Sequence, residues 1–299
     1  MTENLLNLSG KIDALWVSVF QSTHEVASNL QIPFFVVGAT ARDLILEYGF
    51  GVNPFRATKD IDLAVKVPDW ETYEQLMIGL ASSGRFTTTK QQHRLMFDGA
   101  LPVDIIPFGP IATPDTRITW PKDPDFTMNM LGFEEAYEFS FSVRLKDDPI
   151  LEVQVSAPQS LAILKLISWD ERAEGLGKDA ADLFLIICRY LDLGNDDRLA
   201  SDAAILSDVP DFDYERAGAR LLGRDMAASC NAETGNHLLE ILVRETGEKD
   251  RYRLVEAMGG RDIFGDGDKF EKILDLLENV RIGFSEKMAE KDRKHEGSR

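Results

Sequence analysis

The hydrophobic pattern of this chain changes at Ser156, and that change limits the folds open to it. Before Ser156, short apolar runs typical of strands alternate with segments whose apolar residues recur at helical spacing; beyond it, only the helical spacing is found. Residues 156–159 have the pattern of a capping box, with Pro158 near the first helical position, so a helix is expected to begin there. We therefore predict an α+β protein with an α/β domain over residues 1–155 and a helical domain over residues 156–299.

The same patterns predict the elements of the α/β domain. Helices are expected over residues 11–30, 39–48 and 70–81, and strands over residues 34–37, 60–67, 95–97, 103–106, 139–143 and 150–155, with a further strand near residue 86. Residues 49–57 are rich in Gly, Pro and Asn, which predicts a loop. Residues 109–125 contain four prolines and show no periodicity, which predicts a second, longer loop.

Length and charge exclude several classes of protein. The chain has 299 residues, of which 44% are hydrophobic, and its 33 basic and 51 acidic side chains give a net charge of −18. That composition is typical of a folded globular protein rather than a disordered chain, and the acidic excess argues against DNA binding by bulk charge. The excess is shared equally, because residues 1–155 carry 12 basic and 21 acidic side chains and residues 156–299 carry 21 and 30.

Cysteine content and hydropathy bear on where the protein works. Cys188 and Cys230 are too few for a disulfide framework and are expected to be reduced thiols. The first residues lack the basic and apolar segments of a secretion signal, and no apolar run approaches the length of a membrane span. We therefore expect a cytoplasmic protein with no membrane partner.

Acidic side chains on two predicted strands are the strongest chemical signal. Asp60 and Asp62 are two residues apart at the start of a strand, which places both carboxylates on one face of a sheet. Asp104 is the only charged residue of the apolar segment 101–106, where a carboxylate is costly unless a cation or hydrogen-bond donor meets it. Neighbouring strands lie about 5 Å apart, so these three carboxylates could together hold Mg²⁺ or Mn²⁺. The alternative for Asp104 is pairing with an arginine or capping of a turn.

A strand, a glycine turn and the start of a helix precede these aspartates. Residues 36–43 run Val-Val-Gly-Ala-Thr-Ala-Arg-Asp, and the free backbone N–H groups at such a helix start suit an anion such as a triphosphate. Gly38 and Ala39 form the predicted turn, and the Thr40 hydroxyl can donate a hydrogen bond to a phosphate. Arg42 keeps two interpretations, a local pair with Asp43 or a contact with a phosphate.

Together, these residues resemble the signature of the polymerase-β-type nucleotidyltransferase superfamily. Within it, residues 164–172 and 178–183 are similar to the AbiEii/AbiGii toxin-type nucleotidyltransferases, and the resemblance covers about residues 33–194. It implies a nucleotidyltransferase-type mixed sheet flanked by helices in residues 1–155. It also implies an enzyme, a metal-dependent nucleotidyltransferase that moves a nucleoside monophosphate from a nucleoside triphosphate (NTP) to a hydroxyl acceptor.

The resemblance further implies roles for single residues and for partners. Asp60, Asp62 and Asp104 would bind the metal and carry catalysis, with Mg²⁺ or Mn²⁺ as cofactor and Asp104 activating the acceptor hydroxyl. Gly38 and its successor Ala39 would hold the triphosphate of the NTP substrate. The acceptor would be tRNA or a protein, and a toxin of this type would have a cognate antitoxin as partner.

Three further segments keep two interpretations each. Lys165 is the one charge within residues 161–169, so its ammonium either extends to the surface or meets an anion, which the resemblance implies is a nucleotide phosphate. Asp182 either pairs with a nearby arginine such as Arg172 or, as the family's last motif implies, lies near the nucleotide. His93 and Arg94 precede a strand and are expected either at a solvated hairpin end or against a base or acceptor.

Departures from the family pattern leave other functions open. Ala39 stands where the family usually has Gly or Ser, and residues 40–59 make a long gap that implies an extra loop over residues 50–56. One alternative is therefore a non-catalytic nucleotide-binding or antitoxin-like interaction protein on the same fold. Another is a relative of the CCA-adding enzymes and poly(A) polymerases, because Arg42-Asp43 after the glycine turn is similar to their glycine motif.

Overall fold

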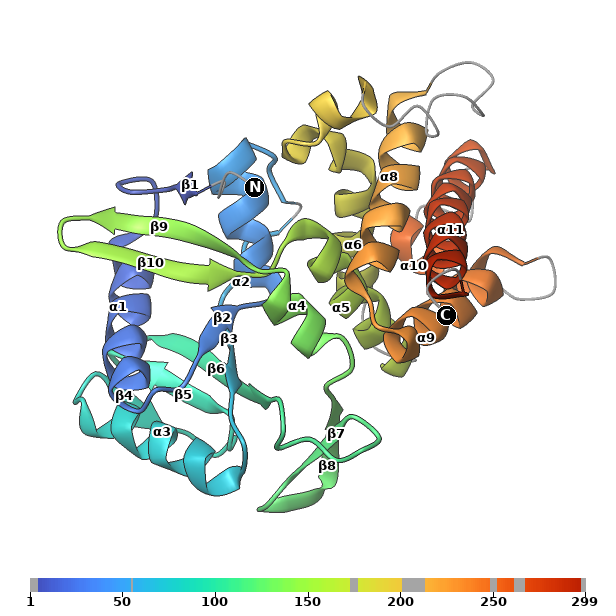
Figure 1. Cartoon of the computed structure of the whole chain (residues 1–299). Coiled ribbons are helices and arrows are strands. Elements are labelled where there is room, and N and C mark those ends of the chain that lie inside the picture. The colour runs from blue at the N-terminus through green and yellow to red at the C-terminus, as the bar shows by residue number, and fades with distance from the viewer. Residues whose placement is uncertain are drawn as a thin grey trace. The chain divides into compact units, whose positions relative to one another are not determined.

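The computed structural model describes residues 5–54, 56–172, 177–200, 213–247, 252–260 and 267–296. The chain divides into two compact units, Met1–Ala157 and Pro158–Arg299. Strands and helices build the first unit, and helices build the described part of the second (Figure 1). The predicted α+β class, with a mixed sheet flanked by helices followed by a helical region, is confirmed.

An eight-stranded mixed sheet forms the centre of the first unit. Its strands are ordered β1 (Leu6–Asn7), β9 (Phe141–Asp147), β10 (Ile150–Val155), β2 (Phe34–Val36), β3 (Ile61–Lys66), β6 (Leu101–Phe108), β5 (Arg94–Phe97) and β4 (Phe86–Thr88). The pairs β1–β9, β10–β2 and β3–β6 are parallel, and the other neighbours are antiparallel. Strands β3 and β6 lie at the middle of the sheet and are buried along most of their length, which explains their apolar sequences.

Helices α1 (Ala14–Asn29) and α3 (Trp70–Ser82) pack against each other, with Gly79 of α3 facing Val26 of α1. Their first turns are capped by Asp13 and Asp69, whose side chains accept backbone N–H hydrogen bonds. After β2, α2 (Gly38–Arg42) continues into a π-helical segment, Asp43–Gly49, so the helix predicted over residues 39–48 is present but widens. Phe55, in the extra loop expected over residues 50–56, lies outside the described residues.

The proline-rich segment 109–125 is not one long loop. It contains β7 (Arg117–Trp120) and the start of β8 (Asp123–Asn129), which form a separate two-stranded antiparallel sheet. Ile118 and Trp120 are buried and alternate with exposed neighbours, which is the period of a strand. The loop prediction is wrong there because Pro121 lies in the turn and Pro124 lies on an edge strand, where a missing N–H is tolerated.

Two further segments differ from expectation, the one between β8 and β9 and the one at the start of the helical unit. The short helix α4 (Phe133–Glu138) precedes β9, so the strand predicted over residues 139–143 begins only at Phe141. In the helical unit, α5 (Pro158–Glu171) begins where a helix was predicted, at Pro158. The Ser156 hydroxyl is buried and has no hydrogen-bond partner among the described residues, so the predicted capping box does not form.

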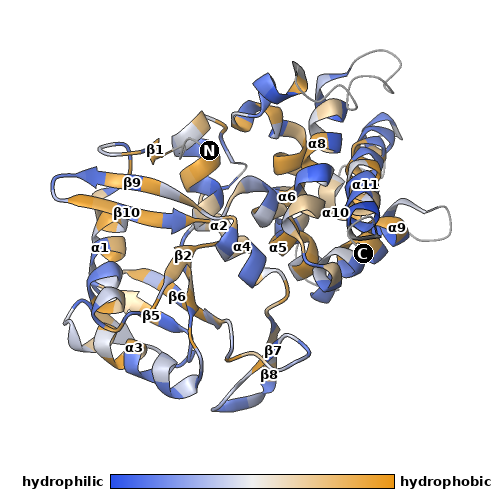
Figure 2. Cartoon of the chain, in the orientation of Figure 1, coloured by the Kyte–Doolittle hydropathy of each residue, from blue (hydrophilic) through white to orange (hydrophobic). Residues whose placement is uncertain are grey.

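The second unit contains α5, α6 (Lys178–Arg189), α8 (Tyr214–Ser229), α9 (Ala232–Thr246), α10 (Arg253–Gly259), α11 (Gly267–Glu296) and the 3₁₀ turns Leu191–Leu193 and Asp196–Ala200. Figure 2 shows hydrophobic residues along α5 and α6 and a largely hydrophilic α11. Helices α8 and α11 pack so closely that a Cβ added at Gly223 or Gly283 would overlap a carbonyl oxygen of the other helix. Every helix in the described ranges is too short or too polar to serve as a membrane span.

Candidate metal-binding active site

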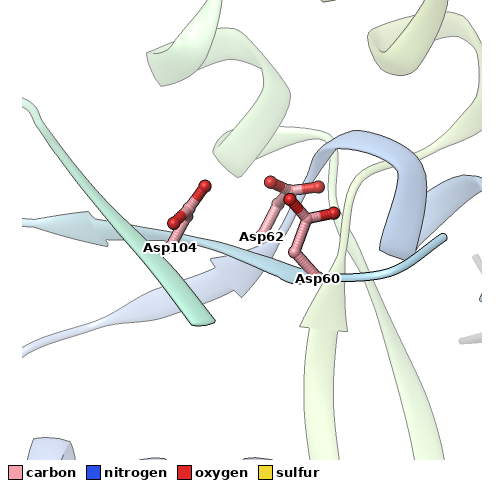
Figure 3. Close-up of side chains that lie close together, drawn as sticks. All are labelled: Asp60, Asp62 and Asp104. Carbon is pink, nitrogen blue, oxygen red and sulfur yellow. The ribbon is translucent and has the colours of Figure 1, made fainter. Parts of the chain in front are cut away.

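The three acidic residues singled out by the sequence meet on one face of the central sheet. Asp62 on β3 lies directly opposite Asp104 on β6, and Asp60 lies two residues before Asp62 and so on the same face. One carboxylate oxygen from each residue lies within 4.8 Å of the other two (Figure 3). Asp104 is buried, whereas Asp60 and Asp62 are half-buried. We call Asp60, Asp62 and Asp104 the carboxylate site.

Arg94 of β5 is a fourth member of this row of side chains. It lies directly opposite Asp104, so Arg94, Asp104 and Asp62 occupy neighbouring positions on one face across β5, β6 and β3. Arg94 Nε and Nη2 donate to Asp104 Oδ1 and Oδ2 at 2.6 and 2.7 Å, and Nη2 also donates to Asp60 Oδ2 at 3.1 Å. The hydrogen bonds to Asp104 raise the pKa of the Arg94 guanidinium. Arg94 is therefore a charged bridge between two of the three carboxylates.

Asp104 pairs with an arginine, as one of its two predicted roles had it. The sequence analysis did not identify that arginine as Arg94, although a signal for it was present. Asp98-Gly99 between two apolar runs is a hairpin signal, and a turn centred on Gly99 brings Arg94 opposite Asp104. Its neighbour His93 is half-buried, and the His93 ring lies 5.4 and 6.0 Å from the rings of Trp120 and Phe126. Burial lowers the pKa of His93. His93 thus packs in an aromatic cluster, while Arg94 carries the charge at the site.

The glycine turn holds Asp62 in place. Gly38 has φ +62°, and a Cβ added there would overlap Asp62 Oδ2, so this position requires glycine. The Ala39 N–H donates to Asp62 Oδ2 at 3.2 Å. The Thr40 hydroxyl donates to the Asp60 carbonyl and accepts from the Asp62 N–H, both at 3.1 Å. The structure therefore uses Thr40, predicted as a phosphate donor, to position the two aspartates.

Arg42 adopts the first of its two predicted roles. Its side chain is fully buried, and its Nε donates to Asp43 Oδ1 at 2.7 Å. Its Nη2 donates to the carbonyl of Arg56 at 2.9 Å, which ties the end of α2 to the loop before β3. A guanidinium this enclosed is a structural link between the glycine turn and the aspartate strand.

Lys165 and Asp182 belong to the helical unit, where each has a charged partner. Lys165 Nζ lies 2.8 Å from both Asp179 Oδ1 and Asp182 Oδ2, and Arg172 Nη1 lies 3.3 Å from Asp179 Oδ2. Burial opposes the charged ammonium, yet the two carboxylates raise the pKa of Lys165 above its usual value. We call Lys165, Asp179, Asp182 and Arg172 the lysine cluster. Contact of Lys165 or Asp182 with a nucleotide stays a prediction.

The donor set of the carboxylate site fits a hard divalent cation. Mg²⁺ and Mn²⁺ favour carboxylate oxygens, and here three carboxylates from two adjacent strands converge. It is the only such acidic group found in the described part of the chain. The absence of a Cβ at Gly38 leaves Asp62 room to turn toward the other two carboxylates. Three like charges at this separation require positive charge, which Arg94 supplies in part.

No protein-family model matches the chain, and no curated protein matches it. Among solved structures, it is similar to an antigenic nucleotidyltransferase-like protein from Paracoccidioides brasiliensis, at 16% identity and a TM-score of 0.39 over 64% of this chain and 90% of that one. It is also similar to ANT(2")-Ia in complex with adenylyl-2"-tobramycin, at 16% identity and a TM-score of 0.34 over 63% and 95% of the two chains.

A third solved structure is the Thermotoga maritima CCA-adding enzyme complexed with tRNA, at 15% identity and a TM-score of 0.26 over 92% of this chain and 70% of that one. Likenesses with TM-scores this low establish neither a family nor an activity. The function of this chain is therefore inferred from the geometry of its own carboxylate site.

Proposed function

We propose that this protein is a metal-dependent nucleotidyltransferase that moves a nucleoside monophosphate from an NTP to a hydroxyl acceptor. The observation that carries the proposal is the convergence of Asp60, Asp62 and Asp104 within 4.8 Å, beside a glycine turn that contacts Asp62. Three carboxylates gathered on one sheet face repel one another, and the single charge of Arg94 offsets only part of that repulsion, which favours a bound divalent cation.

The positions of the three carboxylates suggest different roles for them in metal binding and proton transfer. Asp60 and Asp62, half-buried on one face, would hold the metal together with Asp104. Mg²⁺ or Mn²⁺, when bound, supplies positive charge that draws in the triphosphate and offsets the charge developing on it. Asp104, the most enclosed of the three, would accept the proton of the acceptor hydroxyl as that oxygen bonds to the α-phosphorus and pyrophosphate leaves.

The acidity of the chain is consistent with this proposal. At a net charge of −18, the protein repels a free triphosphate, and binding therefore depends on cations gathered at one place. The Gly38–Ala39 turn abuts Asp62, so a triphosphate held at that turn would lie next to the carboxylate site. For the acceptor we propose tRNA or a protein, and for the biological role a toxin with a cognate antitoxin; both rest on the sequence resemblance of residues 164–172 and 178–183.

The proposal is tested with pure protein, each labelled NTP, Mg²⁺ or Mn²⁺, and a panel of tRNA, total RNA and protein acceptors. We expect label to pass to one class of acceptor. Asp62→Asn is expected to reduce transfer by about 100-fold or more, because loss of a group that merely orients a metal ligand already costs 10–100-fold. Asp98→Asn is the matched control, since Asp98 is exposed and pairs with Arg85 away from the site. Transfer that survives unchanged in Asp62→Asn would contradict the proposal, as would the absence of both labelling and metal-dependent NTP binding.

A further inference from the structure

The positive charge within the carboxylate site comes from Arg94, and its contacts conflict with full use of the site by a metal. Both oxygens of Asp104 accept hydrogen bonds from Arg94, at 2.6 and 2.7 Å, and one oxygen of Asp60 accepts another at 3.1 Å. A divalent cation bound to the same oxygens would lie within a few ångströms of the guanidinium. Two cations that close repel each other strongly in a partly buried site.

We propose that Arg94 is a displaceable internal cation: it neutralises the carboxylate site in the metal-free protein and must release Asp60 and Asp104 when a divalent metal binds. The inference rests on the proposed function only in assigning the metal to Asp60, Asp62 and Asp104. It makes Arg94 a positioning residue that sets the metal affinity of the site.

The surroundings of Arg94 allow the side chain to move while its strand stays in place. The backbone is anchored, because the carbonyl of His93 accepts from the Ile105 N–H at 2.8 Å and the His93 ring packs against Trp120. The Arg94 side chain is 28% exposed, and its guanidinium is held by carboxylates alone among the contacts described. Release therefore requires a change of rotamer toward solvent, with no rearrangement of the sheet.

The pairing of Arg94 with two of the three carboxylates favours divalent over monovalent cations at the site. Arg94 makes a bidentate contact with Asp104, which a monovalent ion gains little by replacing. A divalent ion that contacts three carboxylates gains more than the single charge of Arg94 supplies to two of them. The structure thus predicts a site that stays closed to Na⁺ and K⁺ and opens to Mg²⁺ or Mn²⁺.

The test is a calorimetric titration of the nucleotide-free full-length protein with Mn²⁺. The relevant binding is the part that Asp62→Asn abolishes, which separates the site from weak binding to surface acids. We expect Arg94→Gln to bind Mn²⁺ about tenfold more tightly than wild type, the order expected when a charge-assisted pair no longer has to be broken. Arg94→Lys, which keeps the charge but loses the bidentate contact, is expected to lie between the two.

The matched control is Arg85→Gln, because Arg85 makes a bidentate pair with Asp98 near the same hairpin but away from the site. Its Mn²⁺ affinity is expected to equal that of wild type. Thermal unfolding gives a second readout. Without metal, Arg94→Gln is expected to melt at a lower temperature than wild type, and saturating Mn²⁺ is expected to raise its melting temperature by more than it raises that of wild type.

Mn²⁺ binding by Arg94→Gln and Arg94→Lys that is no tighter than that of wild type, with both variants folded by circular dichroism, would overturn the inference. Weaker binding would show in addition that Arg94 holds Asp104 beside the metal. If Asp62→Asn still abolishes nucleotide transfer in that case, the proposed function stands without this role for Arg94. If wild-type protein shows no Mn²⁺ binding that Asp62→Asn removes, the metal site itself is wrong and the inference is overturned with it.

Discussion

The two compact units of this chain each gather carboxylates around a buried or half-buried cation, and the two clusters differ in charge balance. In the carboxylate site, three aspartates face one guanidinium, that of Arg94. In the lysine cluster, two aspartates face two cations, Lys165 and Arg172. The first cluster keeps an excess of negative charge, whereas the second is neutral by formal charge.

The side chains of the carboxylate site are also more exposed than the buried side chains of the lysine cluster. The Arg94 and Asp60 side chains are 28% and 35% exposed, so a cation from solvent can reach the carboxylate site. The Lys165 and Asp182 side chains are 10% and 5% exposed, so the lysine cluster is closed around its ammonium, and only its Arg172 is largely exposed. An open cluster with excess charge is suited to binding a cation, while a closed neutral cluster is suited to holding helices α5 and α6 together.

The largest expected effect comes from removing the cation of the closed cluster. Lys165→Met leaves Asp179 and Asp182 buried without their ammonium, which is expected to lower the free energy of unfolding by roughly 3–5 kcal/mol. Urea denaturation followed by circular dichroism measures it. Arg172→Gln is the control, because Arg172 is 63% exposed and its removal is expected to cost less than about 1 kcal/mol.

A different outcome would favour the nucleotide contact that the sequence resemblance implies for Lys165. If Lys165→Met keeps its stability and loses NTP binding, the ammonium serves a phosphate and the lysine cluster is functional. That result would contradict the structural role argued from its contacts.

The glycine turn offers the next largest effect, now at the open cluster. Gly38→Ala places a Cβ against Asp62 in a left-handed backbone conformation, so we expect a loss of roughly 1–2 kcal/mol in the free energy of unfolding. We also expect at least about tenfold weaker Mn²⁺ binding, because Asp62 must move. Denaturation and calorimetry measure the two effects.

Gly84→Ala separates backbone strain from contact with Asp62. Gly84 has φ +79°, but a Cβ added there meets nothing within 4 Å. This variant is expected to lose a similar amount of stability and to bind Mn²⁺ as wild type does. Equal Mn²⁺ affinity in both glycine variants would show that Gly38 does not position Asp62.

The smallest expected effect concerns a half-buried ion cluster of the helical unit, formed by Arg224, Lys287 and Glu290, which serves as a reference for the lysine cluster. Hydrogen bonds from Lys287 and Arg224 lower the pKa of Glu290 from 4.5 to about 2. Because the folded pKa lies below the unfolded one, this stabilisation is complete above about pH 4.5 and is lost as the pH falls toward 2. At pH 6, Glu290→Gln is expected to cost only about 0.5 kcal/mol, since solvent reaches the half-buried Glu290 carboxylate and screens its ion pairs.

Urea denaturation of wild type and Glu290→Gln from pH 6 to pH 3 measures this effect. The difference between the two proteins is expected to shrink below pH 4.5. A difference that stays constant with pH would show that Glu290 contributes by packing rather than by charge.

Local patterns were sufficient for part of the site. Asp60 and Asp62 share a face because side chains alternate along a strand, and Asp104 stood out because it is the one charge in an apolar run. The same local patterns do not predict which polar side chains are buried. Thr40 and Arg42 follow a glycine turn as phosphate ligands would, and both are fully buried and hydrogen-bonded to the chain around the aspartate strand. Their contact with a phosphate stays a prediction.

Pairing between distant segments accounts for the remaining differences. Arg94 reaches the carboxylates because β5 and β6 pair in a register that sets it opposite Asp104. The β7–β8 hairpin was missed because its prolines lie where a two-stranded sheet tolerates them. Lys165 pairs with carboxylates on a second helix, and helical periodicity within one segment does not predict contacts between two helices.

The amino-acid sequence alone predicts the change from an α/β to a helical pattern near Ser156 and the shared face of Asp60 and Asp62, because both follow from the repeat of side chains along one element. Three features are visible only in the folded chain: Asp104 lies opposite Asp62, Arg94 lies opposite Asp104, and Lys165 is enclosed by two aspartates. Strand register, burial and ion pairing depend on contacts between segments far apart in the chain, and those contacts set which charges each carboxylate meets.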